Sequence, residues 1–179
     1  MSTPGSDDDT AFRFTIDLPV TSKWEDIALV RSSVEMCLST LFHDLERPQA
    51  LAMVTGELLE NAVKYGAWGR EAGIFRLRIW GSRGAESFVE VSNPVDGDDA
   101  ASAVIDAVRL LRSADSPAAA LQARMMEIAS GTGPGGSGLG LLRIAYEGAC
   151  ELEAMVDGGV VTVTARLEPR RLAADSARN

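Results

Sequence analysis

Five segments of the chain alternate hydrophobic and polar residues, as half-buried strands do. They are residues 12–18, 73–81, 86–93, 150–156 and 160–167. The second and third are separated only by SRGA, and the fourth and fifth meet at Asp157, Gly158 and Gly159. Both spacings are typical of β-hairpins, so the pattern predicts a sheet in which chain neighbours often pair.

Other segments repeat hydrophobic residues every three or four positions, which indicates helices with one buried face. Residues 24–42 form the first, and ERPQ separates it from a second at residues 49–65. Helices are also predicted around residues 103–111 and 118–128, and a short one follows a glycine-rich stretch. The hydrophobic residues that define the first helix are Ile27, Val30, Val34, Leu38 and Leu41.

This order of elements predicts an α+β fold: a two-layer α/β sandwich whose mixed, mostly antiparallel sheet carries its helices on one face. A doubly wound fold would alternate strand and helix throughout, and this chain does not. We expect one domain over residues 11–168. The ends, residues 1–10 and 169–179, are predicted to be disordered.

Composition narrows the classes of function. Hydrophobic residues make up 46% of the chain and charged residues 24%, which is ordinary for a soluble globular protein. The net charge of −9 argues against nucleic-acid binding. No signal-peptide or membrane-span pattern is present, so we expect a cytoplasmic protein without a membrane contact. Cys37 and Cys150 lie in apolar patterns and are predicted to be buried thiols, neither disulfide-bonded nor zinc-bound.

The stretch TGELLENAVKYG, residues 55–66, carries an unusual polar stripe. Glu57, Asn61 and Lys64 are spaced four and three residues apart, so they share one face of a helix. A stripe of this kind is by itself more often a solvated surface than a binding site. The opposite face is hydrophobic: Val54, Leu58, Ala62 and Tyr65.

The glycine-rich stretch GTGPGGSGLGLLRIA, residues 131–145, leads into a helix. Glycines allow backbone N–H groups to approach an anion, and the first helical turn adds unpaired donors, so the stretch suits phosphate binding. A flexible connector is the alternative. Its literal GxGxxG match lacks a preceding strand, and the lysine of a P-loop is absent. The chain also lacks the HRD and DFG motifs of eukaryotic-type kinases.

Taken together, ELLENAVKYG and GGSGLGLLRIA resemble the N box and the G2 box of the GHKL (Bergerat-fold) superfamily, which includes histidine-kinase ATP-binding domains, gyrase and MutL. The resemblance extends from about Phe12 to Leu167. The N-terminal FRFTIDLP, without a dimerisation–phosphotransfer hairpin, is most similar to the bacterial anti-sigma-factor serine kinases. The helical insertion at about residues 94–135 resembles the ATP lid of SiaB-like partner-switching kinases.

The resemblance implies ATP and Mg²⁺ as cofactors. Glu57 would be the general base that takes the proton from the attacking hydroxyl, and Asn61 would hold Mg²⁺ through its amide oxygen. Lys64 would place its ammonium near a phosphate. The residues of the G2 box that would contact the nucleotide are Gly136, Gly138, Leu139 and Gly140.

The adenine site departs from the family pattern. Asn93 stands where an aspartate is expected, and Pro94 and Val95 follow it in place of glycines. An asparagine carbonyl can still accept a hydrogen bond from the adenine amino group. The late threonine of the family is displaced, and Thr162 or Thr164 is the candidate for it. Arg143 is interpreted as a surface residue, with phosphate binding as the alternative.

Three functions follow from the resemblance. The first is a serine/threonine protein kinase of a bacterial partner-switching module, which phosphorylates a small antagonist protein of the anti-anti-sigma type. The second is a weakly nucleotide-binding regulator that sequesters a sigma factor or another partner without catalysis. The third is a histidine-kinase-type ATP-binding domain acting in trans. The family also implies a possible homodimer.

Overall fold

The computed structural model describes residues 11–19, 27–42, 44–67, 74–131 and 139–169. Its centre is a five-stranded sheet with the strand order β1-β2-β3-β5-β4. The strands are β1 (Ala11–Pro19), β2 (Ile74–Ser82), β3 (Ser87–Pro94), β4 (Cys150–Asp157) and β5 (Val160–Leu167).

Every strand pairing in this sheet is antiparallel, which corrects the expectation of a mixed sheet. The final hairpin explains the difference. Its second strand, β5, inserts between β3 and β4, so β3 and β4 run parallel without being hydrogen-bonded to each other. The predicted hairpin turn is confirmed, since Gly158 and Gly159 both adopt positive φ values there.

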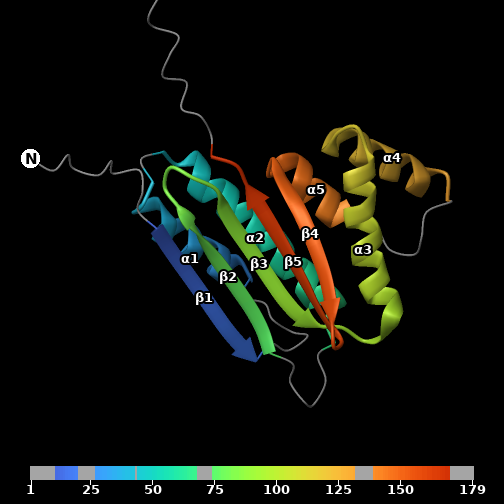
Figure 1. The fold of residues 1–179 in the computed structure, drawn as a ribbon, viewed down its shortest axis with the longest axis horizontal. Helices are drawn as coiled ribbons and strands as arrows, with labels where there is room; N and C mark the ends of the chain where they lie inside the picture. Colours follow the sequence, from blue (N-terminus) through green and yellow to red (C-terminus); the bar gives the residue numbers. More distant parts are fainter. Residues whose placement is uncertain (1–10, 20–26, 43, 68–73, 132–138, 170–179) are drawn as a thin grey trace, which may run out of the picture.

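Three helices cover one face of the sheet: α1 (Ile27–Ser39), α2 (Glu46–Tyr65) and α5 (Leu139–Glu147) (Figure 1). The other two, α3 (Gly97–Ser113) and α4 (Pro117–Ala129), lie beyond the β4 edge, where α3 contacts β4 and both contact α5. The predicted two-layer α+β architecture is confirmed. Its core lies between the sheet and the helices, and the largest fully buried side chains include Phe75, Leu51, Leu58, Leu59, Leu77 and Ile79.

Helix α2 begins three residues earlier than the sequence pattern suggested, because Pro48 lies within its first turn. The first N–H groups of a helix have no partner inside it, so a proline is tolerated there. This start places Arg47 at the end of the sheet. Its guanidinium donates to the Leu167 carbonyl at 2.7 Å and to Ser87 Oγ at 3.1 Å.

The two cysteines differ. Cys150 is buried, and desolvation raises the pKa of its thiol to about 12. Cys37 is exposed, which corrects the prediction of a buried thiol. On α1 it lies beside Leu38, which faces the core, but it points away. No helix within the described residues is long and apolar enough to cross a membrane.

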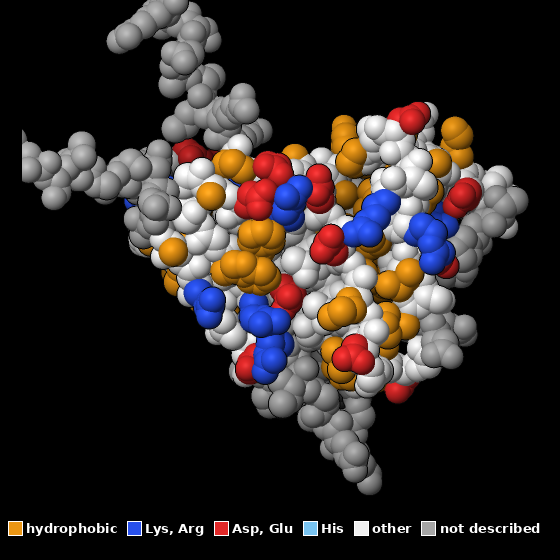
Figure 2. Space-filling model, viewed as in Figure 1, with side chains coloured by type: hydrophobic (Ala, Val, Ile, Leu, Met, Phe, Trp, Pro, Cys, Tyr) orange, Lys and Arg blue, Asp and Glu red, His pale blue; other side chains and the backbone are white. Residues whose placement is uncertain are grey.

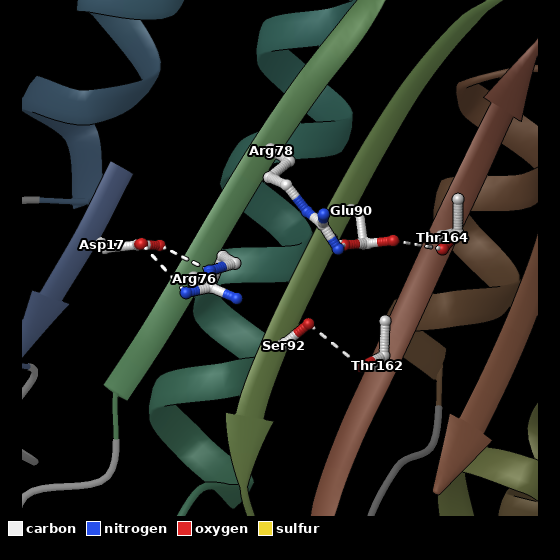
Figure 3. Close-up of polar contacts among 7 residues, drawn as sticks. All are labelled: Asp17, Arg76, Arg78, Glu90, Ser92, Thr162 and Thr164. Carbon is white, nitrogen blue, oxygen red and sulfur yellow. Dashed lines mark hydrogen bonds and ion pairs between the residues drawn. The ribbon is translucent and has the colours of Figure 1, made fainter. Parts of the chain in front are cut away.

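The face of the sheet turned away from the helices carries charged side chains with hydrophobic ones between them (Figure 2), including the stacked rings of Trp80 and Phe88. Its side chains form cross-strand pairs: Arg76 Nε lies 2.8 Å from Asp17 Oδ1, and Arg78 Nε lies 2.7 Å from Glu90 Oε1 (Figure 3). The charges on this face are therefore largely neutralised by their neighbours on adjacent strands. An antiparallel sheet with one solvated face commonly has this pattern.

Candidate functional site

Helices α2 and α5 cross in antiparallel directions, and two glycines of the α5 segment come very close to α2. A Cβ added to Gly148 would lie 2.8 Å from Val54 Cγ2, near the middle of α2. A Cβ added to Gly140 would lie 2.8 Å from Asn61 Oδ1, about two turns further along α2. The register of this crossing brings the polar stripe of α2 against the first turns of α5.

Asn61 and Gly140 are in direct contact at this crossing. Besides the Oδ1 contact, the Cβ of any larger residue at position 140 would lie 3.0 Å from Asn61 Nδ2. A glycine is therefore required for the amide of Asn61 to rest on the backbone of the first turn of α5. Residues 55–66 and the first turn of α5, which are far apart in sequence, therefore lie side by side.

The amide of Asn61 is the feature of this crossing that best fits a bound group. Its Nδ2 atom is buried and has no hydrogen-bond partner among the described residues. A buried polar group without a partner is costly, so its presence calls for an explanation such as a ligand. The amide also offers an oxygen, the ligand type that Mg²⁺ prefers. The described residues contain no cluster of three acidic, histidine or cysteine side chains that suits a metal.

Glu57 lies one turn before Asn61 on the same face of α2. Its carboxylate forms an ion pair and hydrogen bond with the guanidinium of Arg143 on α5. The Glu57 side chain is 16% exposed and that of Arg143 is 49% exposed. Arg143 Nε also lies 3.6 Å from a carboxylate oxygen of Glu147, one turn further along α5. The interpretation of Arg143 as an ordinary surface residue missed this contact, and nothing in the local sequence signals it.

Asn93, the candidate for adenine binding, lies at the end of β3. It is 6% exposed and lies on the helix-covered face. Its Nδ2 donates to the Pro94 carbonyl at 3.0 Å, which leaves Oδ1 as the atom that would accept from an adenine amino group. The Pro94 carbonyl also accepts from the Ala67 amide at 2.8 Å, so the end of α2 is tied to the end of this strand.

The remaining residues of the predicted site differ in placement. Leu139 begins α5 beside Gly140, so it lies at the crossing. Lys64 is exposed in the last turn of α2, with Nζ 5.0 Å from the centroid of the Tyr65 ring. Gly136 and Gly138 lie outside the described residues.

Thr162 is not brought into this site, and this corrects its predicted role. In β5 the buried residues Val161 and Val163 face the helices, so Thr162 between them points to the opposite face. There its hydroxyl lies 3.0 Å from Ser92 Oγ, in the row of polar side chains on the solvated face (Figure 3). On the helix-covered face, Val161 is the residue that pairs with Asn93.

The fold is similar to that of a solved protein. A chain in the crystal structure of the SiaB–SiaC complex from Pseudomonas aeruginosa matches with a TM-score of 0.63, and the match covers 86% of this chain and 88% of that one. The two sequences are 19% identical over the match, which shows a shared fold. No protein-family model and no curated protein matches the chain. Fold and site together define an α+β sandwich protein in which polar side chains of α2 meet the first turns of α5. Membership of the GHKL superfamily stays a prediction.

Proposed function

We propose that the protein is an ATP- and Mg²⁺-dependent serine/threonine kinase of a bacterial partner-switching module. The observation that carries this proposal is the contact between Asn61 and Gly140. It joins the two sequence boxes at one point and leaves a buried amide nitrogen without a partner among the described residues. A site for a metal–triphosphate group requires this convergence, because both boxes must reach the same phosphates.

In this proposal, Asn61, the first turn of α5 and Glu57 would each take part in phosphoryl transfer. Asn61 would hold Mg²⁺ through its amide oxygen, and backbone N–H groups in the first turn of α5 would bind phosphate oxygens. Glu57 would accept the proton of the attacking serine or threonine hydroxyl. A bound ATP would supply the γ-phosphoryl group: the hydroxyl oxygen would form the new O–P bond, the bond to the β-phosphate would break, and ADP would leave.

The substrate in this proposal is a small antagonist protein. The structural similarity to a chain crystallised in a complex of two different proteins, SiaB and SiaC, supports a protein partner. Helix α4 also offers hydrophobic side chains for such a contact, because Met125 is 55% exposed, Met126 is 57% exposed and Ile128 is 40% exposed. Exposed methionines adapt their shape readily to a partner.

A second function is favoured by a different observation. The carboxylate of Glu57 is already paired with Arg143, and Asn93 brings no negative charge to the predicted adenine site. Both features suit a regulator that uses this fold to sequester a sigma factor or another partner without catalysis.

Titration calorimetry with ATP and Mg²⁺ distinguishes the two functions. We expect wild-type protein to release binding heat, and we expect Asn61→Ala to reduce the affinity by at least about tenfold because the metal loses its protein ligand. The matched control is Asn93→Asp, which restores the family residue and should tighten binding. Absence of binding heat in all three proteins would favour the non-catalytic regulator.

If ATP binds, transfer of labelled phosphate to a candidate antagonist of the anti-anti-sigma type tests catalysis. Glu57→Gln keeps the size of the side chain but removes the base, and we expect it to slow transfer by about 10²–10⁴-fold. Undiminished transfer by this variant would remove Glu57 from the mechanism.

A further inference from the structure

Arg143 has a position from which it can reach two different anions. Its side chain extends from the second turn of α5, and long side chains in helices lean back toward the N-terminus of their own helix. The first turn of α5, which carries Gly140, is therefore within the range of its guanidinium. At present that guanidinium holds the Glu57 carboxylate of α2.

The pairing of Glu57 conflicts with its proposed role. A general base must present its carboxylate to the hydroxyl whose proton it accepts, within hydrogen-bond distance. Here Oε1 of Glu57 already accepts from Arg143 Nη2, and only 16% of the Glu57 side chain is exposed. A substrate hydroxyl would have to compete with a guanidinium, which is a stronger donor because it is charged.

A phosphate group would resolve this conflict. Guanidinium groups bind phosphate oxygens in the same forked geometry in which they bind carboxylates, and a triphosphate carries more negative charge than one glutamate. Half of the Arg143 side chain is exposed, and its second carboxylate neighbour, Glu147, is 3.6 Å away, so the guanidinium is not enclosed.

We propose that Arg143 is a positioning residue that exchanges Glu57 for the terminal phosphates of a bound nucleoside triphosphate. In the free protein Arg143 holds Glu57 and blocks it. When a triphosphate occupies the first turn of α5, Arg143 turns to the phosphates and releases the carboxylate for proton acceptance. The base would then become available only when the phosphoryl donor is in place. This inference rests on the proposed kinase function.

The exchange predicts a thermodynamic coupling that calorimetry can measure without turnover. The ligand is the non-hydrolysable analogue AMP-PNP with Mg²⁺, and the proteins are the wild type, Glu57→Gln, Arg143→Gln and the double variant. Glu57→Gln removes the competitor for Arg143, so we expect about fivefold tighter binding, the amount that one partly exposed ion pair is worth. Arg143→Gln should weaken binding by about tenfold. The double variant should bind as Arg143→Gln does.

Two controls isolate the exchange. Glu60→Gln removes the same charge from an exposed position of the same helix, and it should leave the affinity unchanged. ADP lacks the terminal phosphate, so Glu57→Gln should change its affinity less than that of AMP-PNP. Arg143→Lys keeps the positive charge and should retain part of the affinity. A partial loss in this variant would show that the weaker binding of Arg143→Gln comes from the lost charge and not from misfolding. Thermal unfolding of each variant verifies that it is folded.

The outcomes separate this inference from the proposed function. If Glu57→Gln tightens binding equally with and without Arg143, the gain is a general charge effect and the exchange is refuted. If AMP-PNP binds the wild type but Arg143→Gln binds it equally well, Arg143 is only a brace between α2 and α5. If the wild type binds no nucleotide at all, the proposed kinase function fails, and the exchange fails with it.

Discussion

The two glycines at the crossing of α2 and α5 provide a sharp test of the site, because alanine at each position meets a different kind of atom. At Gly140 the new Cβ would lie 2.8 Å from Asn61 Oδ1, at the end of a side chain that can rotate. At Gly148 it would lie 2.6 Å from the backbone carbonyl oxygen of Ile144, and 2.8 Å from Val54 Cγ2. Val54 is fully buried, so neither atom can move freely.

These contacts predict that only Gly148→Ala clearly lowers the stability. Gly148→Ala overpacks the core and should cost about 2 kcal/mol, within the usual range for such substitutions. For a domain of this size, that corresponds to a fall in Tm of about 4–8 °C. In Gly140→Ala the rotation of Asn61 relieves the contact, and the helix gains about 1 kcal/mol because alanine replaces glycine. The stability of Gly140→Ala should therefore lie within about 1 kcal/mol of the wild type.

For nucleotide binding, Gly140→Ala should be the variant with the clear loss. Gly140→Ala displaces the amide that would hold Mg²⁺, so its affinity for AMP-PNP and Mg²⁺ should fall by at least about tenfold, or 1.4 kcal/mol. Gly148→Ala should bind with nearly normal affinity at temperatures well below its Tm. Thermal unfolding followed by circular dichroism gives the first quantity, and titration calorimetry gives the second. Equal losses of Tm in the two variants, or unchanged affinity in Gly140→Ala, would refute this account of the crossing.

Three further predictions concern the rest of the molecule. Arg47→Met leaves the Leu167 carbonyl and other acceptors without their charged donor. It should therefore lower the free energy of unfolding by about 2–4 kcal/mol in chemical denaturation, and a change below about 0.5 kcal/mol would contradict this prediction. Ala149 has a φ of 46°, a left-handed conformation that glycine adopts without strain. Ala149→Gly should therefore raise the stability by up to about 1 kcal/mol in the same assay. An unchanged or lower denaturation midpoint would contradict this prediction. A thiol reagent at pH 8 should label Cys37 rapidly and Cys150 only after unfolding. Rapid labelling of both thiols in the native protein would contradict the burial of Cys150. Because burial raises the pKa of the Cys150 thiol to about 12, the thiol keeps its proton in the folded protein. Its contribution to stability should therefore be full below about pH 9 and be lost as the pH rises toward 12.

The proposed exchange of Arg143 links catalysis to nucleotide occupancy through one ion pair. In the proposed kinase, the carboxylate of Glu57 would become free to accept a proton only when a triphosphate is bound. The same ion pair braces α2 against α5, so its energetic contribution to folding and its regulatory role are separable only by the coupled variants described above.

The sequence by itself determined most of the architecture. Alternation along the strands, helical spacing and the glycine turn at residues 158 and 159 predicted the elements and their order, because these patterns reflect local backbone geometry. The alternation in β5 also predicts which face of the sheet Thr162 occupies. With Val161 and Val163 on the buried face, the threonine between them had to face the other way, and the family resemblance pointed to it nevertheless.

Only the tertiary structure decided how the elements meet. A periodic pattern shows which residues share a face of one helix, but it does not fix the register between two helices that are far apart in sequence. Arg143 and Glu57 are separated by 86 positions, and their contact depends on how closely Gly140 and Gly148 let α5 approach α2. The exposure of Cys37 likewise depends on which side of α1 packs against its neighbours. Side-chain packing in three dimensions sets both, and this is why the local sequence carries no signal for them.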